Sequence, residues 1–450
     1  MSPTRREFVV GGAAAAAGAV GIYELVDRLS GGTPTRPHVA NAPAEQHLLE
    51  GVRVVQQDGV AVLVPPLHHE IVTARVAVDP ADRLDAQHEL EQVLARIEGE
   101  YEPSPAGLGV TVAWGLPYFH RFVPDAARKH LPQDMRAGKP ALTDARRFPS
   151  DPASTALEQN DVAVLLRSDA RAHVDAGVAE LQKTPLLHVT SLRRGFVGGG
   201  LPKQLALAAN VPGADLIPDD SELFLGFTST QRANMGPGRI ANFETLGCVD
   251  LRGGYFHHGT HMHLSHISED LETWYVNFEF AERAATVFRP GLKVRDNAQV
   301  VPQGPSQVQS EDQVVSGFAK TGAIGHSGAI QTTSRLQHDV VGPDGTRYPK
   351  GSAIPVRADF NTLDNPFYWS ERAGELQRGP AAGVHFVVFN PTSDDFDRNR
   401  LAMDGVLPGK RLPLPAGDRG QGFNSVLQTT HRQNYLVPPR VHRSFPLAEL

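Results

Sequence analysis

The stretch GTHMHLSHISEDLETW, residues 259–274, is where the fold of this chain is most easily recognised. Residues 260–267 are predicted as a β-strand, and residues 269–288, EDLETWYVNFEFAERAATVF, are predicted as one or two helices. A strand that leads directly into a helix begins a βα unit. The segments on either side therefore decide whether the chain repeats this order.

Histidines crowd the beginning of this stretch, at positions 257, 258, 261, 263 and 266. Side chains alternate between the two faces of a strand, so His261 and His263 share one face and His266 points to the other. A His-x-His pair can chelate zinc or copper if a third ligand comes from elsewhere. The same side chains could instead line a cavity, or have no functional role.

The first half of the chain predicts one ferredoxin-like βαββαβ unit. Its strands and helices alternate in the order strand, helix, strand, strand, helix, strand, over residues 70–78, 81–100, 107–115, 160–168, 170–182 and 186–196. The second half repeats this order less clearly. Its predicted elements are the strand 260–267, the helices within 269–288, the strand 383–390, a helix over 394–405 and the strand 433–439.

The predicted fold class is therefore α+β, with two tandem ferredoxin-like domains of the dimeric α/β-barrel superfamily type. We expect the first domain over 58–205 and the second over 215–450. A Pro-, Gly- and Gln-rich insertion at about 290–380 interrupts the second domain, and regular structure is hard to assign within it.

Composition excludes several functional classes. The formal net charge of −7 argues against general nucleic-acid binding, which requires a basic face. Cys248 is the single cysteine, so neither an intrachain disulfide nor a cysteine-rich zinc or iron–sulfur site can form.

The first 42 residues are predicted to be a twin-arginine export signal and linker. Arg5 and Arg6 precede an apolar run over about 9–23 that is short for a membrane span. The alternative is a basic terminus without a targeting role. Cleavage could follow Ala40-Asn41-Ala42, or the segment could be retained as an anchor. We expect the twin-arginine export machinery as a partner, and a secreted, periplasmic or membrane-anchored location.

Five segments, taken in order along the chain, resemble the dye-decolorising peroxidases, which are haem enzymes built from two ferredoxin-like domains. These segments are VPPLHHEIVTARVAVDPAD (64–82), AGLGVTVAWGLPYF (106–119), NDVAVLLRSDARAHVDAGVAEL (160–181), LHVTSLRRGFVGG (187–199) and GTHMHLSHISEDLETW (259–274). The resemblance implies haem b as cofactor, bound in the second domain. The histidines of strand 260–267 depart from the family pattern, which is mostly apolar or arginine-bearing there.

The resemblance also implies particular haem-site residues. The axial histidine corresponds to His326, in KTGAIGHSGAIQTTSRL, with His338 as the nearest rival. The distal arginine corresponds to Arg357, in IPVRADFN, where Asp359 and Asn361 are polar neighbours. A loop histidine without a role and a surface ion pair are the corresponding alternatives for His326 and Arg357.

The family's distal aspartate belongs to a Gly-x-x-Asp-Gly motif, and the matching place is LGFTSTQ, residues 225–231. Gly226 and Phe227 fit this motif, but Ser229 stands where the aspartate belongs. A serine hydroxyl cannot carry a proton near neutral pH as a carboxylate can. Either Arg357 acts alone, or a histidine such as His261 or His263 substitutes, or the reaction is not peroxidation.

Three functions follow from this reasoning. The first is an exported haem-dependent oxidoreductase that uses hydrogen peroxide and a small-molecule substrate with altered distal chemistry. The second is a haem-binding protein with little turnover. The third is a haem-free protein that binds a metal or an organic ligand through the histidine strand. Self-association is also expected, because this superfamily often associates through its sheets.

Overall fold

The computed structural model describes residues 22–23, 25–26, 29, 44–46, 52–228, 242–251, 253–300, 309–342, 345–366, 379–414 and 422–450. Arg5 and Arg6 of the predicted export signal lie outside these residues. Within the described residues, no helix is long and apolar enough to span a bilayer.

The first half forms the predicted βαββαβ unit. Its elements are β3 (His68–Val76), α3 (Arg83–Gly99), β4 (Gly109–Gly115), β8 (Val162–Ser168), α6 (Arg171–Lys183) and β9 (Leu187–Phe196). The strands pair antiparallel in the order β9-β3-β8-β4. Helix α3 buries Leu90, Val93, Leu94 and Ile97 because they recur at helical spacing on one face.

The second half repeats the unit. Its elements are β10 (Thr260–Glu269), α9 (Leu271–Asn277), α10 (Phe280–Val287), β14 (Phe360–Thr362), β15 (Gly383–Asn390), α13 (Ser393–Met403) and β16 (Leu427–Val437). The strand order β16-β10-β15-β14 is the same arrangement as in the first half. The prediction of two tandem ferredoxin-like units is confirmed.

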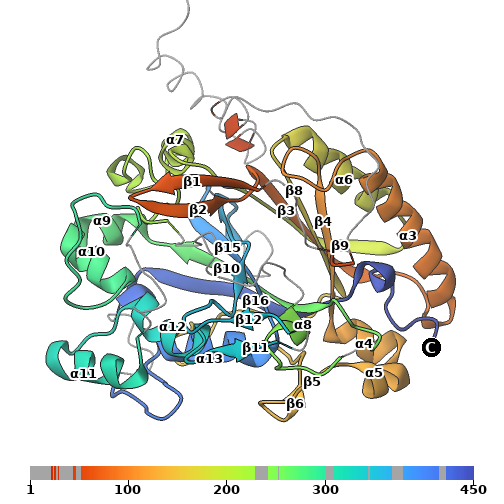
Figure 1. Cartoon of the computed structure of the whole chain (residues 1–450). Helices are drawn as coiled ribbons and strands as arrows, with labels where there is room; N and C mark the ends of the chain where they lie inside the picture. Colours follow the sequence, from red (N-terminus) through yellow and green to blue (C-terminus); the bar gives the residue numbers. More distant parts are fainter. Residues whose placement is uncertain are drawn as a thin grey trace, which may run out of the picture.

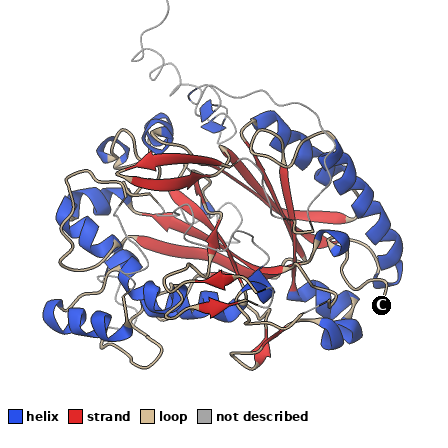
Figure 2. Ribbon diagram, in the orientation of Figure 1, coloured by secondary structure: helices blue, strands red, loops and turns tan. Residues whose placement is uncertain are grey.

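The two units join into one ring of strands. Asn361 of β14 pairs with Phe196 of β9, while Tyr435 and Leu436 of β16 pair with Gly115 and Trp114 of β4. Helices α3 and α6 lie on one side of the molecule and α9 and α10 on the other, with the strands between them (Figures 1 and 2).

The inside of the ring is a core of its own. Alternate side chains of each strand point inward and pack together, among them Ile71, Leu165, Leu264, Phe360 and Phe389. The opposite faces of the strands pack largely against the helices, although His188 and Thr190 of β9 are exposed.

The insertion at 290–380 contains more regular structure than its composition suggests. Its described part holds α11 (Glu311–Thr321), α12 (His326–Ser334), the short pair β11 (Val340–Val341) and β12 (Arg347–Tyr348), β13 (Val356–Arg357), and β14. Both His326 and Arg357 therefore lie within the insertion, on a helix and on a strand.

A hairpin that the sequence analysis did not predict precedes the first unit. Strands β1 (Arg53–Gln57) and β2 (Val60–Val64) are joined by Asp58 and Gly59, which have φ of 48° and 77°. Both residues of a type I′ turn require positive φ, and Asp-Gly is a preferred pair for this turn.

Part of the predicted export segment is packed into the fold. Helix α7 (Leu201–Ala208) belongs to a hydrophobic cluster that also contains the buried residues Ile22, Tyr23 and Val26. The Tyr23 hydroxyl lies 3.1 Å from the Asp364 carboxylate and from the Arg194 carbonyl oxygen, and it accepts a bond from the Leu363 amide at 3.0 Å. The Tyr23 hydroxyl therefore connects the N-terminal segment to Arg194, Leu363 and Asp364 through hydrogen bonds.

Candidate functional site

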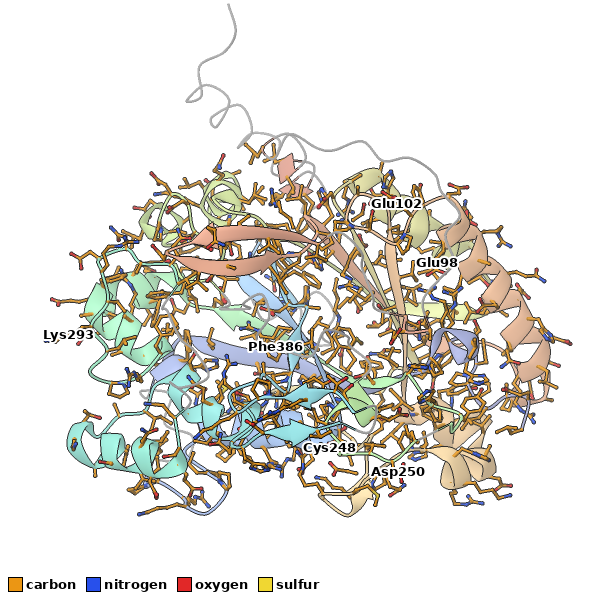
Figure 3. All side chains as sticks on the ribbon, viewed as in Figure 1. Glu98, Glu102, Cys248, Asp250, Lys293 and Phe386 are labelled. Carbon is orange, nitrogen blue, oxygen red and sulfur yellow. The ribbon has the colours of Figure 1, made fainter. Side chains whose placement is uncertain are left out.

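A cavity of about 690 Å³ lies between the outer face of the second unit's strands and the helices of the insertion. This volume falls within the range of about 300–1,000 Å³ that is usual for ligand pockets. The lining is largely hydrophobic and includes five phenylalanines, at positions 227, 288, 386, 396 and 423. Phe386 contributes from β15 and is labelled near the centre of the molecule in Figure 3.

His326 lines this cavity as the first residue of α12. The start of the helix lies close against the chain at Phe288 and Arg289. A Cβ at Gly325 would lie 2.4 Å from the Arg289 Cα, so glycine is required for this approach. The Gly328 amide donates to the Phe288 carbonyl at 2.7 Å and holds the contact.

The His326 imidazole lies deep in the protein, and the surface it retains borders the cavity. Burial, with contributions from the charges of Arg357 and Arg400, lowers its pKa to about 3. The ring is therefore neutral at physiological pH and can act as a ligand to a metal. Its Nδ1 has no hydrogen-bond partner among the described residues.

Arg357 lines the same cavity from β13. Its Nε donates to Asp359 Oδ1 at 2.9 Å and its Nη2 donates to Oδ2 at 2.6 Å. A two-point contact of this kind fixes the plane of a guanidinium. Asp359 also lines the cavity, so the pair presents one oriented cation together with its counterion.

The 225–231 segment is described only in its first part. Leu225, Phe227 and Thr228 line the cavity, as expected for Phe227. Gly226 is not among the lining residues. It has φ of 83°, and a Cβ there would lie 3.0 Å from the Tyr275 hydroxyl. Ser229 lies outside the described residues.

The histidines of β10 do not line the cavity. His261 and His263 do share one face, as predicted, and both are fully buried. The His263 ring lies 3.3 Å from the Phe396 ring, and its nitrogens lie 2.6 Å from Asn434 Oδ1 and Ser265 Oγ. Burial lowers the pKa of His261 to about 3 and that of His263 well below its usual value, so both rings are neutral at physiological pH.

His266 points into the ring interior, opposite to His261 and His263. It faces His385 of β15, with ring centroids 4.4 Å apart, and pairs in register with His431 of β16. Among the described residues there is no group of three or more His, Cys, Asp or Glu side chains arranged to hold a metal ion. His338, the rival to His326, is exposed and does not line the cavity.

Sequence reasoning missed Glu269, the last residue of β10. It was assigned to the following helix, but β10 continues through it and places it on the cavity face with Ser265 and Ile267. The alternation of side chains along an extended β10 would have found it. Burial, with a smaller contribution from the charge of Asp359, raises the pKa of Glu269 to about 8.

A group of charged side chains also lines the cavity. Asp151 accepts hydrogen bonds from Arg432 at 2.9 Å and from Arg400 at 3.2 Å. Arg335 also lines the cavity and donates to the Gly351 carbonyl at 3.0 Å. Burial lowers the pKa of Arg335, and within the described part of the chain it makes no ion pair. An anionic group in the cavity would stabilise this cation.

The family model that matches residues 66–439 is that of DUF7405, a family of unknown function. This chain belongs to that family. The match covers both ferredoxin-like units and the residues that line the cavity, except Val54, Ala61 and Leu63 of the β1–β2 hairpin. No curated protein sequence matches the chain.

Solved structures show what the DUF7405 fold resembles. A Shewanella oneidensis protein assigned to the DyP-type peroxidases is 14% identical, with a TM-score of 0.51, and the match covers 91% of this chain and 99% of that one. A DyP-type peroxidase from Cellulomonas bogoriensis is 17% identical, with a TM-score of 0.50 and coverage of 88% and 96%. The encapsulated DyP-type peroxidase of Mycobacterium smegmatis is 13% identical, with a TM-score of 0.50 and coverage of 84% and 95%. At these identities the similarity establishes the fold.

Proposed function

We propose that this DUF7405 protein binds haem b in the described cavity, with His326 as the axial ligand, and is an oxidoreductase that reduces hydrogen peroxide. The single observation that carries the proposal is that His326 and Arg357, separated by 31 positions and by two short strands, line one hydrophobic cavity. The structural neighbours described as DyP-type peroxidases add support at the level of fold.

The residues of the cavity fit a haem in three respects. The phenylalanines suit an aromatic macrocycle. The neutral His326 imidazole needs no deprotonation before it binds iron. Arg335, a half-buried cation without an ion pair in the described chain, suits a propionate carboxylate. When bound, a haem would supply the two electrons that reduce hydrogen peroxide to water.

This chain's own side chains would hold and orient the peroxide. The Arg357 guanidinium is always protonated, and Asp359 keeps its plane fixed, so it can stabilise negative charge that develops on a peroxide oxygen. The hydrophobic wall excludes water and strengthens this interaction. A small-molecule reductant is the second substrate.

One observation favours a second candidate function, haem binding with little turnover. An axial histidine normally donates its other ring N–H to a carboxylate or carbonyl, which makes the ligand more basic. Nδ1 of His326 has no such partner among the described residues. The imidazole would then donate less electron density to the iron, and peroxide cleavage would be slow.

Haem binding is tested by visible and near-ultraviolet absorption of the protein expressed with haem supplied. The wild type is expected to show an intense Soret band. His326→Ala should lose this band or greatly weaken it with an unchanged circular dichroism spectrum, because the iron loses its ligand. The matched control His338→Ala removes an exposed histidine and should leave the band intact.

Two results would contradict the proposal. A wild type without a Soret band after expression with haem would exclude haem binding. An unchanged band in His326→Ala would assign the axial position to another residue. Peroxide-dependent oxidation of a dye or phenol by the haem-loaded wild type then separates an oxidoreductase from a haem carrier.

We also propose that the protein is exported by the twin-arginine route, on the basis of Arg5, Arg6 and the apolar run that follows. This route carries folded proteins, so a cofactor could be inserted before export. Self-association remains a proposal that the size of the purified protein in solution would test.

A further inference from the structure

The Glu269 carboxyl differs from the other carboxyls that line the cavity. Asp151 and Asp359 are held in ion pairs with arginines. Glu269 makes no ion pair among the described residues, and its Oε2 is buried without a hydrogen-bond partner in them. A buried carboxyl without a partner is disfavoured as the anion, so it keeps its proton to a higher pH than a paired one.

The surroundings of Glu269 do not provide a counterion. Tyr275 of α9 is nearby and its pKa is raised by burial and by the charge of Glu269, but its hydroxyl donates to the Phe224 carbonyl at 2.6 Å. Arg283 lies over the Tyr275 ring, 4.9 Å from its centroid. The other charged or titratable side chains that line the cavity are Asp151, His326, Arg335, Arg357, Asp359, Arg400 and Arg432.

We propose that Glu269 is the group that exchanges a proton with the ligand bound in this cavity. The proposal rests on the proposed function and adds a residue to it. General acid–base assistance requires a group that is within reach of the ligand and can hold a proton transiently. Glu269 lines the cavity, and its pKa of about 8 lies near physiological pH. His261 and His263 lie outside the lining, and Asp359 is occupied by Arg357.

Hydrogen peroxide exchanges one proton with Glu269. The Glu269 carboxylate accepts one proton from H2O2 and leaves HOO⁻, whose charge the Arg357 guanidinium stabilises. When the O–O bond breaks, the carboxylic acid returns this proton to the outer oxygen, which leaves as water. A haem bound in the cavity would supply the two electrons. Two electrons from the small-molecule reductant, together with two protons, would then restore it and release the second oxygen as water.

The protonation of Glu269 can be measured without haem. Infrared difference spectra of the apoprotein, recorded as a pH titration, should show a carboxylic-acid C=O band that disappears near pH 8. The band should be absent in Glu269→Gln, an isosteric change that cannot titrate. Glu70 and Asp364 are also buried carboxyls with raised pKa values, of about 7 and 6, so wild type and variant must be compared directly. Glu272→Gln, the same change at an exposed carboxyl of α9 that does not line the cavity, is the matched control.

The exchange itself is measured with the haem-loaded protein by stopped-flow absorbance after peroxide is added. The wild-type rate should rise about tenfold per pH unit below pH 8 and level off above it, because the carboxylate is the proton acceptor. Glu269→Gln should lose about 10²–10⁴-fold in rate together with this pH dependence, and its Soret band should be unchanged. The control Glu272→Gln should keep both the rate and the Soret band of the wild type.

The outcomes separate this proposal from the proposed function. Normal haem binding with an unchanged rate and pH profile in Glu269→Gln would overturn the role of Glu269 alone. Failure of every variant and of the wild type to bind haem would overturn the proposed function, and the infrared titration would then decide the proposal. If the transition near pH 8 persists in Glu269→Gln, another group titrates there and the role of Glu269 is refuted. If the transition is lost, Glu269 is the titrating group, which supports proton exchange with an acidic ligand other than hydrogen peroxide.

Discussion

Stability at mildly acidic pH should depend on His69, and the size of the effect can be worked out from the structure. His69 lies on β3 inside the ring of strands, fully buried, with its Nε2 2.8 Å from the Pro66 carbonyl oxygen and its ring 4.8 Å from that of Phe360. Burial, aided by the charge of Arg167, lowers its pKa to about 3. In the unfolded chain the pKa of a histidine is about 6.5.

A depressed pKa makes the folded state the weaker proton binder, so the stabilisation present above pH 6.5 is lost as the pH falls. Between pH 7.5 and 5.5 the unfolded chain protonates this histidine and the folded chain does not. The linkage relation then gives a decrease of about 1.4 kcal/mol in the free energy of unfolding from this one residue.

The comparison is between the wild type and His69→Gln. Glutamine can still donate to the Pro66 carbonyl but does not titrate. Urea unfolding of the apoproteins at pH 7.5 and 5.5, followed by circular dichroism, should show a smaller decrease of stability in the variant, by about 1.4 kcal/mol. Both proteins keep all their other titrating groups, so the contributions of those groups to the pH dependence of stability cancel when the two proteins are compared. The exposed His338→Gln should behave as the wild type. Equal pH dependence in the wild type and His69→Gln would refute the reasoning.

Two further predictions concern the N-terminal segment. Tyr23→Phe removes the hydroxyl that contacts Asp364 and should lower the free energy of unfolding by about 1–3 kcal/mol. Tyr23→Ala should lower it further, and urea unfolding measures both variants. If neither variant loses stability, this contact does not form in solution. Replacement of Arg5 and Arg6 by lysine should leave a folded protein in the cytoplasm, as measured by cell fractionation, and unchanged export would exclude the twin-arginine route.

Most strands and helices of both units were predictable because their side chains follow simple spacing. Strand β8 is a nearly continuous apolar run, and α3 repeats its apolar residues every three or four positions. The β1–β2 hairpin was missed although its Asp58-Gly59 turn is a strong local signal. Strands β13 and β14 are only two and three residues long, which is too short for any periodicity to appear.

The candidate site was less predictable because it depends on contacts between distant segments. His326 and Arg357 were assigned by resemblance, and no local pattern shows that the insertion folds back over β15 to bring them to one cavity. The histidines of β10 looked functional because they are polar, but they lie on faces that are covered by Phe396 or by His385. Glu269 was overlooked because the strand is longer than its apolar pattern indicates.

The ring of strands constrains the order in which this chain can fold. Strand β16, the last one in the sequence, lies between β10 and β4 and pairs with both of them. The ring therefore cannot close until a ribosome has synthesised nearly the whole chain, and the inward-facing side chains of the earlier strands stay uncovered until then. Contacts of such long sequence separation slow folding. Completion of translation, rather than emergence of the first ferredoxin-like unit, should set the moment at which the chain becomes compact.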